Sequence, residues 1–203
     1  MKFAGLSVLA GATLLPGVLA HPAARQATEF VNHCGRPIVF HQAFPAPLGS
    51  NAGYNGETMT LPAHGGSKTL PMIVKPPGQS GGVSTKFRWE GDHHLNGEFQ
   101  FEYTLVAVAD AAHQAGLTWD PSLVDAGGPG KGGRGPFGHV NVKITPSQTE
   151  NPSRYWNCVP VTCKANQECA HAYKYYDNHN TRDHGRILCE SIIFKLRMEV
   201  SSI

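Results

Sequence analysis

The sequence contains few charged residues. Only 16% of its 203 residues are Asp, Glu, Lys or Arg, against roughly a quarter in an average domain. This scarcity argues against a coiled coil, an acidic tail or charge-driven disorder. The charges also nearly cancel, because 17 basic side chains stand against 15 acidic ones. A field strong enough to attract nucleic acid or an anionic membrane is therefore absent, and we expect neither as a partner.

Long apolar runs are missing after the first twenty residues, so nothing later in the chain predicts a membrane span. The start itself resembles a secretory signal. Lys2 precedes an apolar run from Phe3 to Leu15, and small residues end at Ala20. We therefore expect residues 1–20 to be a signal peptide and the rest to be secreted and extracellular. We expect residues 21–28 to form a disordered leader and residues 29–203 a single, monomeric domain.

The sequence also lacks the two CxxC pairs that would indicate a structural zinc site. Its 5 cysteines are Cys34, Cys158, Cys163, Cys169 and Cys189. In an oxidising compartment this number predicts two disulfides and one free thiol. We expect Cys34 to pair with Cys189, which would join the two ends of the domain. The second disulfide then uses two of Cys158, Cys163 and Cys169.

The 23 glycines and 15 prolines make long helices improbable. Short β-type runs recur instead, at residues 30–31, 37–41, 58–61, 69–74, 83–89, 99–109, 140–144 and 192–200. Residues 99–105 alternate apolar and polar side chains, which predicts one buried and one solvated face, with Glu102 on the polar face. One short helix is predicted at residues 167–175, with Asn166 as its N-cap. The expected fold is all-β, an antiparallel sandwich with long Gly- and Pro-rich loops.

Three ordered blocks resemble thaumatin-like proteins, especially the small fungal secreted branch of Bys1-type yeast-phase proteins. They are FVNHC at residues 30–34, FEYTL at 101–105 and WDPSLVD at 119–125. The resemblance implies a disulfide-stapled β-sandwich, an extracellular or cell-wall location, and a bond from Cys34 to the last cysteine. It also implies an acidic cleft, which in larger members is associated with binding of β-1,3-glucan and sometimes with weak hydrolysis.

Three carboxylates are the candidate ligand-binding residues: Glu102, Asp120 and Asp125. In one groove they could accept hydrogen bonds from sugar hydroxyls or act as a catalytic acid and base. Lys86 or Arg88 would keep them ionised. Trp119, with Trp89 and Tyr103, could stack on sugar rings, although aromatic residues of a sandwich are more often in the core. In the alternative interpretation, Asp120 forms a turn before Pro121, Asp125 caps a loop and Glu102 is simply solvated.

The histidines offer a different hypothesis. A mature N-terminal His21 could chelate copper together with His93 or His94 and an axial Tyr103. His171, His179 and His184 lie near Asp177 and Asp183 and could hold zinc or copper, although their spacing matches no known ligand pattern. The GxGxxG pattern at residues 128–133 does not indicate a dinucleotide site, because no βαβ unit surrounds it. We therefore expect no cofactor and no metal.

The sequence therefore predicts a secreted protein that binds cell-wall polysaccharide, with β-glucan favoured, or a host surface protein. We expect this binding to be non-catalytic. The alternatives are a weak endo-β-1,3-glucanase that uses the same carboxylates and a His-rich copper- or zinc-binding protein.

Overall fold

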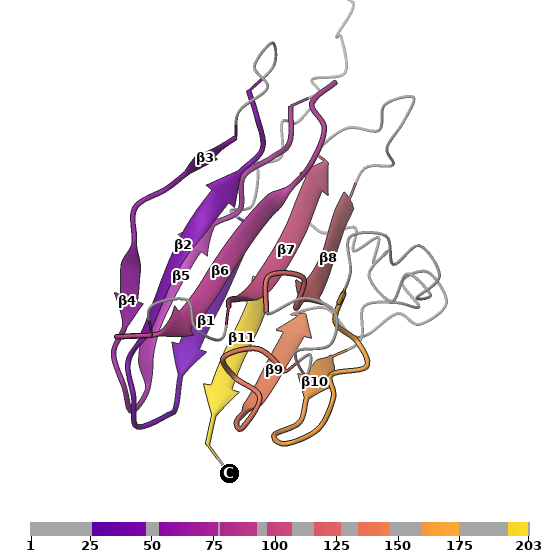
Figure 1. The fold of residues 1–203 in the computed structure, drawn as a ribbon. Helices are drawn as coiled ribbons and strands as arrows, with labels where there is room; N and C mark the ends of the chain where they lie inside the picture. Colours follow the sequence, from indigo (N-terminus) through magenta and orange to yellow (C-terminus); the bar gives the residue numbers. More distant parts are fainter. Residues whose placement is uncertain are drawn as a thin grey trace, which may run out of the picture.

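The chain folds into strands throughout the part that can be described. The computed structural model describes residues 26–47, 53–76, 78–92, 97–106, 116–126, 134–146, 160–174 and 195–202. Within these ranges there are eleven strands and no helix (Figure 1). The same ranges hold no helix long and apolar enough to cross a bilayer.

Two sheets make up the fold. The first, called sheet A here, has the order β10-β9-β11-β1-β5. Its strands are β1 (Ala27–Asn32), β5 (Gly66–Pro71), β9 (Asn141–Pro146), β10 (Val161–Cys163) and β11 (Lys195–Ser201). Sheet B has the order β3-β2-β6-β7-β8, with β4 also paired to β2. Its strands are β2 (Ile38–Phe44), β3 (Tyr54–Asn55), β4 (Met59–Leu61), β6 (Val83–Trp89), β7 (Phe99–Val106) and β8 (Gly116–Ser122).

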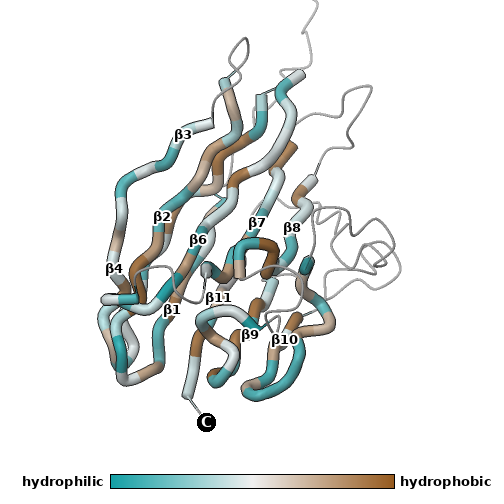
Figure 2. Tube along the Cα trace, in the orientation of Figure 1, coloured by the Kyte–Doolittle hydropathy of each residue, from teal (hydrophilic) through white to brown (hydrophobic). Residues whose placement is uncertain are grey.

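The two sheets pack face to face around one apolar core, which confirms the predicted all-β sandwich. Neighbouring strands are antiparallel except for β1 and β11, which run parallel, with Ala27 beside Lys195 and Asn32 beside Val200. Residues alternate between the core and the outer face along most of β2, β6, β7 and β8 in sheet B. Figure 2 shows hydrophobic and hydrophilic residues following one another along β6, β7 and β8.

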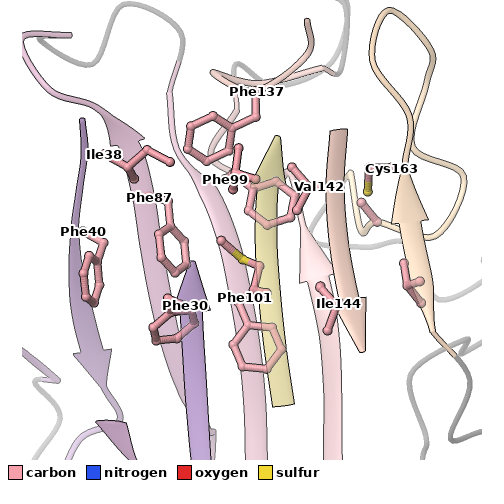
Figure 3. Packing of buried hydrophobic residues seen from close by; sticks show 14 of the residues in the cluster. Phe30, Ile38, Phe40, Phe87, Phe99, Phe101, Phe137, Val142, Ile144 and Cys163 are labelled. Carbon is pink, nitrogen blue, oxygen red and sulfur yellow. The ribbon is translucent and has the colours of Figure 1, made fainter. Parts of the chain in front are cut away.

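Phe30 is the central contact between the sheets. It lies on β1 of sheet A and is completely buried. Its ring centroid lies 5.5 Å from that of Phe40, 5.0 Å from that of Phe87 and 6.2 Å from that of Phe101, all on sheet B (Figure 3). The rings of Phe87 and Phe101 meet Phe30 edge to face, the arrangement that the aromatic quadrupole favours. One ring of sheet A is therefore enclosed by three rings of sheet B.

Each of the eight strand segments predicted from the sequence overlaps an observed strand, and β6 has the predicted bounds. Strands β3, β8 and β10 were not predicted. The domain also begins earlier than expected, because Ala27 and Thr28 are buried residues of β1 rather than part of a leader. The other residues of the predicted signal peptide and leader, 1–25, lie outside the described residues.

The predicted helix at residues 167–175 is not formed over residues 167–174, which the structure describes as turns and bends. Asn166 does not cap a helix but has a left-handed backbone with φ of 60°. The disulfide between Cys163 and Cys169 closes a tight loop around it. Tyr173 then bonds to β8, where its N–H donates to the carbonyl of Pro121. A loop closed by a disulfide and followed by a strand-like bridge leaves no room for helical hydrogen bonds.

The predicted bond between Cys34 and Cys189 is wrong, because Cys34 is a free, buried thiol. Cys34 follows β1 and lies beside the end of β11, where the His33 N–H donates to the carbonyl of Val200. Cys189 lies outside the described residues. The buried Asn32 side chain holds the turn instead, since its Oδ1 accepts from the Cys34 N–H at 3.0 Å. The expected disulfide within the second group of cysteines is confirmed as Cys163–Cys169.

Truncation of Phe30 tests the inter-sheet core. We expect Phe30→Ala to lower the free energy of unfolding by about 3–5 kcal/mol, because it leaves a cavity among three rings. The exposed strand substitution Thr69→Ala is the control and should stay within about 0.5 kcal/mol of the wild type. Urea unfolding followed by circular dichroism measures both. A loss below about 1 kcal/mol for Phe30→Ala would show that the ring does not join the sheets.

Thiol titration tests the state of Cys34. Burial raises the pKa of the Cys34 thiol, partly offset by a backbone hydrogen bond at Ser202. We therefore expect Cys34 not to react with a disulfide reagent in the native protein and to react once the chain is denatured. Replacing it by serine should remove one thiol from the denatured count. A count that instead rises by one would mean that Cys34 had been paired.

Candidate functional site

The candidate site lies on the outer face of sheet B, over β6, β7 and β8. Strand alternation turns the large apolar side chains of these strands inward and leaves the polar ones outside. The register places Ser84, Glu102 and Asp120 side by side in one row across the three strands. The adjoining row contains Lys86, Gln100 and Ser122. Two of the three predicted carboxylates are thus neighbours on adjacent strands.

Asp125 joins this group from the turn that follows β8. Its Oδ2 lies 2.5 Å from Nζ of Lys86. Gly97 allows this approach, since it has a φ of +68° and a Cβ there would lie 2.0 Å from the carbonyl oxygen of Asp125. The Glu98 N–H donates to the same carbonyl. Residues 97 and 98 therefore hold the turn that carries the third carboxylate.

Lys86 is the cation at the centre of the cluster. Besides Asp125, its Nζ lies 4.0 Å from Oε2 of Glu98, whose side chain is only 11% exposed. Its charge also acts on Glu102 and lowers the pKa of that carboxyl. Arg88, on the same face of β6, makes no ion pair with these carboxylates in the part of the chain that the structure describes. Of the two predicted cations, Lys86 is therefore the one placed among the acids.

Glu102 is largely shielded from solvent. Burial raises the pKa of its carboxyl, and the charge of Asp125 raises it further. Hydrogen bonds with Ser122 and Ser84 and the charge of Lys86 act in the opposite direction. Burial is the largest of these causes, so Glu102 keeps its proton to a higher pH than an exposed glutamate.

An open polar pocket of about 230 Å³ borders this row. The polar residues that line it are Ser84, Glu102, Thr104, Thr118 and Asp120. Hydroxyls and carboxylates together can both donate hydrogen bonds to a hydroxyl-rich ligand and accept them from it.

The alternative interpretation of Asp120 as a turn residue is wrong, because Asp120 and Pro121 lie within β8.

Trp119 cannot stack on a sugar, which corrects the sequence prediction. It lies on β8 next to Asp120 but faces the core, where it is 1% exposed. Trp89 and Tyr103 are each 3% exposed and are core residues as well. The alternative interpretation of these aromatic residues as core is the correct one.

Four further residues shape the site and were not predicted from the sequence: Ser84, Gly97, Glu98 and Ser122. The positions of Ser84 and Ser122 at the site follow from strand alternation once β6 and β8 are known to pair with β7. Gly97 and Glu98 follow only from the contact with the turn at Asp125, which no local pattern indicates.

No group of three or more His, Cys, Asp or Glu side chains in the described ranges could hold a metal ion. His171 is exposed in the turn after Cys169. The other histidines proposed as metal ligands, His21, His93, His94, His179 and His184, lie outside the described residues, as do Asp177 and Asp183. The copper and zinc hypotheses thus stay predictions.

Comparison with known proteins finds one fold neighbour. No known protein-family profile matches the chain, and no curated protein is significantly similar to it. Among solved structures, the crystal structure of the protein elicitor MoHrip2 from Magnaporthe oryzae is similar, with a TM-score of 0.54 at 17% identity. The match covers 87% of this chain and 99% of that chain. At this identity the similarity concerns the fold alone.

The raised pKa of Glu102 predicts a pH-dependent stability. The folded state binds the proton more tightly than the unfolded chain, so Glu102 contributes stability below its ordinary pKa of 4.5. That contribution is lost as the pH rises through the higher folded-state value. We therefore expect Glu102→Gln to gain stability relative to the wild type as the pH rises above 4.5.

Urea unfolding at several pH values measures this difference. Thr118→Ser alters the same pocket without removing a carboxyl, so its effect on the free energy of unfolding should not change with pH. If Glu102→Gln instead lost stability relative to the wild type as the pH rose, the folded protein would stabilise the ionised form of the Glu102 carboxyl.

Proposed function

We propose that this chain is a secreted protein that binds cell-wall polysaccharide non-catalytically, with β-1,3-glucan as the favoured ligand. The binding residues are Glu102, Asp120 and Asp125, with Lys86 paired to Asp125. The observation that carries the proposal is the row of carboxylate and hydroxyl side chains along the open polar pocket on sheet B.

The chemistry of the pocket suits a sugar chain. Carboxylates accept paired hydrogen bonds from adjacent sugar hydroxyls, and the threonine and serine hydroxyls can donate or accept. Nζ of Lys86 lies 2.5 Å from Oδ2 of Asp125, so a cation also stands within the acidic group and can donate hydrogen bonds. The pocket is open to solvent, so a hydroxyl-rich ligand can reach the carboxylates of Glu102 and Asp120.

A weak β-1,3-glucan hydrolase is the second candidate, and one observation favours it. A glycosidase needs one carboxyl that stays protonated to act as the general acid. Burial of Glu102 shifts its pKa in that direction, and Asp120 is its partner in the strand register. Glu102 would then donate the proton to the leaving oxygen.

A host surface protein is the alternative ligand. The fold neighbour is described as a protein elicitor. The same polar face would then contact a protein, and binding to insoluble glucan would be absent.

Co-sedimentation with insoluble β-1,3-glucan, chitin and cellulose tests the proposal. We expect glucan-selective binding that weakens about tenfold or more in the triple variant Glu102→Gln, Asp120→Asn, Asp125→Asn. Each change keeps the shape of the side chain but removes a charged acceptor, whose hydrogen bonds contribute about 1.5–3 kcal/mol each.

A second triple variant controls for the change in net charge. Glu57→Gln, Glu90→Gln and Glu168→Gln remove the same charge from exposed residues elsewhere and should leave binding unchanged. A wild type that stays in the supernatant with every polysaccharide would contradict the proposal. Release of reducing ends from soluble glucan, lost in Glu102→Gln, would identify the hydrolase instead.

A further inference from the structure

Gln100 is a buried polar residue on the outer face of sheet B. Its neighbours on β7, Phe99 and Phe101, belong to the core, so strand alternation turns Gln100 to the other side. Only 4% of the residue is exposed there. In the strand register it lies between Lys86 of β6 and Ser122 of β8. An amide shielded from water in this way needs hydrogen-bond partners within the protein.

Ser84 supplies one of these hydrogen bonds. Its hydroxyl donates to Oε1 of Gln100 at 2.8 Å. The same side chain forms a hydrogen bond with Glu102, which lies opposite Ser84 in the strand register. Ser84 therefore connects the buried amide to the carboxyl that lines the polar pocket.

The Ser84 hydroxyl has a single proton to donate. Donation to the ionised Glu102 lowers the pKa of that carboxyl. When the proton is donated to Gln100 instead, as in this structure, the hydroxyl can only accept a hydrogen bond from Glu102. A carboxyl donates only when it is protonated. Gln100 and the ionised Glu102 thus compete for one proton, and the amide favours the protonated carboxyl.

We propose that Gln100 is a positioning residue of the polar site: by taking the proton of Ser84, it holds the Glu102 carboxyl in its protonated, donating form. The inference rests on the proposed function for its consequence, because the ionised Glu102 is one of the acceptors proposed for sugar hydroxyls. Binding of β-1,3-glucan should therefore strengthen as the pH rises through the titration of Glu102.

Several charges surround Glu102 besides this hydrogen-bond chain. Lys86 acts on it from β6 and Asp125 from the turn after β8, in opposite directions. Asp120 lies opposite it on β8, and Glu98, just before β7, lies near Lys86. A neutral substitution of the amide leaves all of these charges in place, so its effect on Glu102 reports the hydrogen bond alone.

The titration of the Glu102 side-chain carboxyl, followed by nuclear magnetic resonance without any ligand, tests the inference. Gln100→Met keeps the length of the side chain but removes the amide. Ser84 should then donate to Glu102, and the titration midpoint should fall below that of the wild type. In a Ser84→Ala background the same substitution should leave the midpoint unchanged. A midpoint that stays or rises in Gln100→Met would overturn the inference, and so would a fall that persists without Ser84.

Gln42→Met is the matched control. Gln42 is a buried glutamine of β2 whose Nε2 donates to Oγ1 of Thr85 on β6, on the core side of the sheet. Its substitution should leave the midpoint of Glu102 unchanged. An equal fall in this variant would show that the loss of any buried amide is enough, against the inference.

A second measurement leaves Gln100 in place, in case Gln100→Met does not fold. The side-chain amide signals of Gln100 should shift with the same midpoint as Glu102 in the wild type. In Ser84→Ala they should no longer follow that titration. Amide signals that do not change across the titration of Glu102 in the wild type would contradict the connection through Ser84.

Binding of a soluble β-1,3-glucan oligosaccharide at several pH values separates this inference from the proposed function. We expect the affinity to rise about tenfold across the titration of Glu102, and the rise should begin at a lower pH in Gln100→Met. The same pH dependence in both proteins would overturn the inference. An oligosaccharide that binds at no pH would contradict the proposed function, while the titration without ligand would still decide the role of Gln100.

Discussion

The enclosure of Phe30 by three rings of the opposite sheet is the contact on which the rest of the structure depends. It fixes β1, and through it β11 and β5, against β2, β6 and β7. Because the inner side chains of sheet B pack into this core, strand alternation leaves the outer face for polar side chains. The location of the polar pocket follows from that division.

The polar site combines burial with charge on a single sheet face. Lys86 lies between Glu98 and Asp125 and lowers the pKa of Glu102, while burial raises it more. The result is an acidic row in which the Glu102 carboxyl keeps its proton to a higher pH than an exposed glutamate. Such a row can bind hydroxyls, and it becomes catalytic only if a substrate reaches Glu102 while it is protonated.

Local patterns predicted the inner strands of sheet B and the polar side of β7. They failed where the structure depends on contacts between residues far apart in the sequence. Asp120 and Pro121 look like a turn, yet β8 is an edge strand, where a proline costs no ladder hydrogen bond. Missing β8 also left Trp119 available as a sugar platform, although alternation along that strand sends its ring into the core. Cys34 is a free, buried thiol beside the end of β11, and the parallel pairing of β1 with β11 that places it there is indicated by no local signal.

Nuclear magnetic resonance with a soluble β-1,3-glucan oligosaccharide tests the central claim most directly, because it maps the contact surface residue by residue. We predict that the backbone amide chemical shifts of β6, β7 and β8 change around Lys86, Glu102 and Asp120. The amide shifts of β9 and β10 on the opposite sheet should stay unchanged. Shifts confined to sheet A, or no shifts at saturating oligosaccharide, would contradict it.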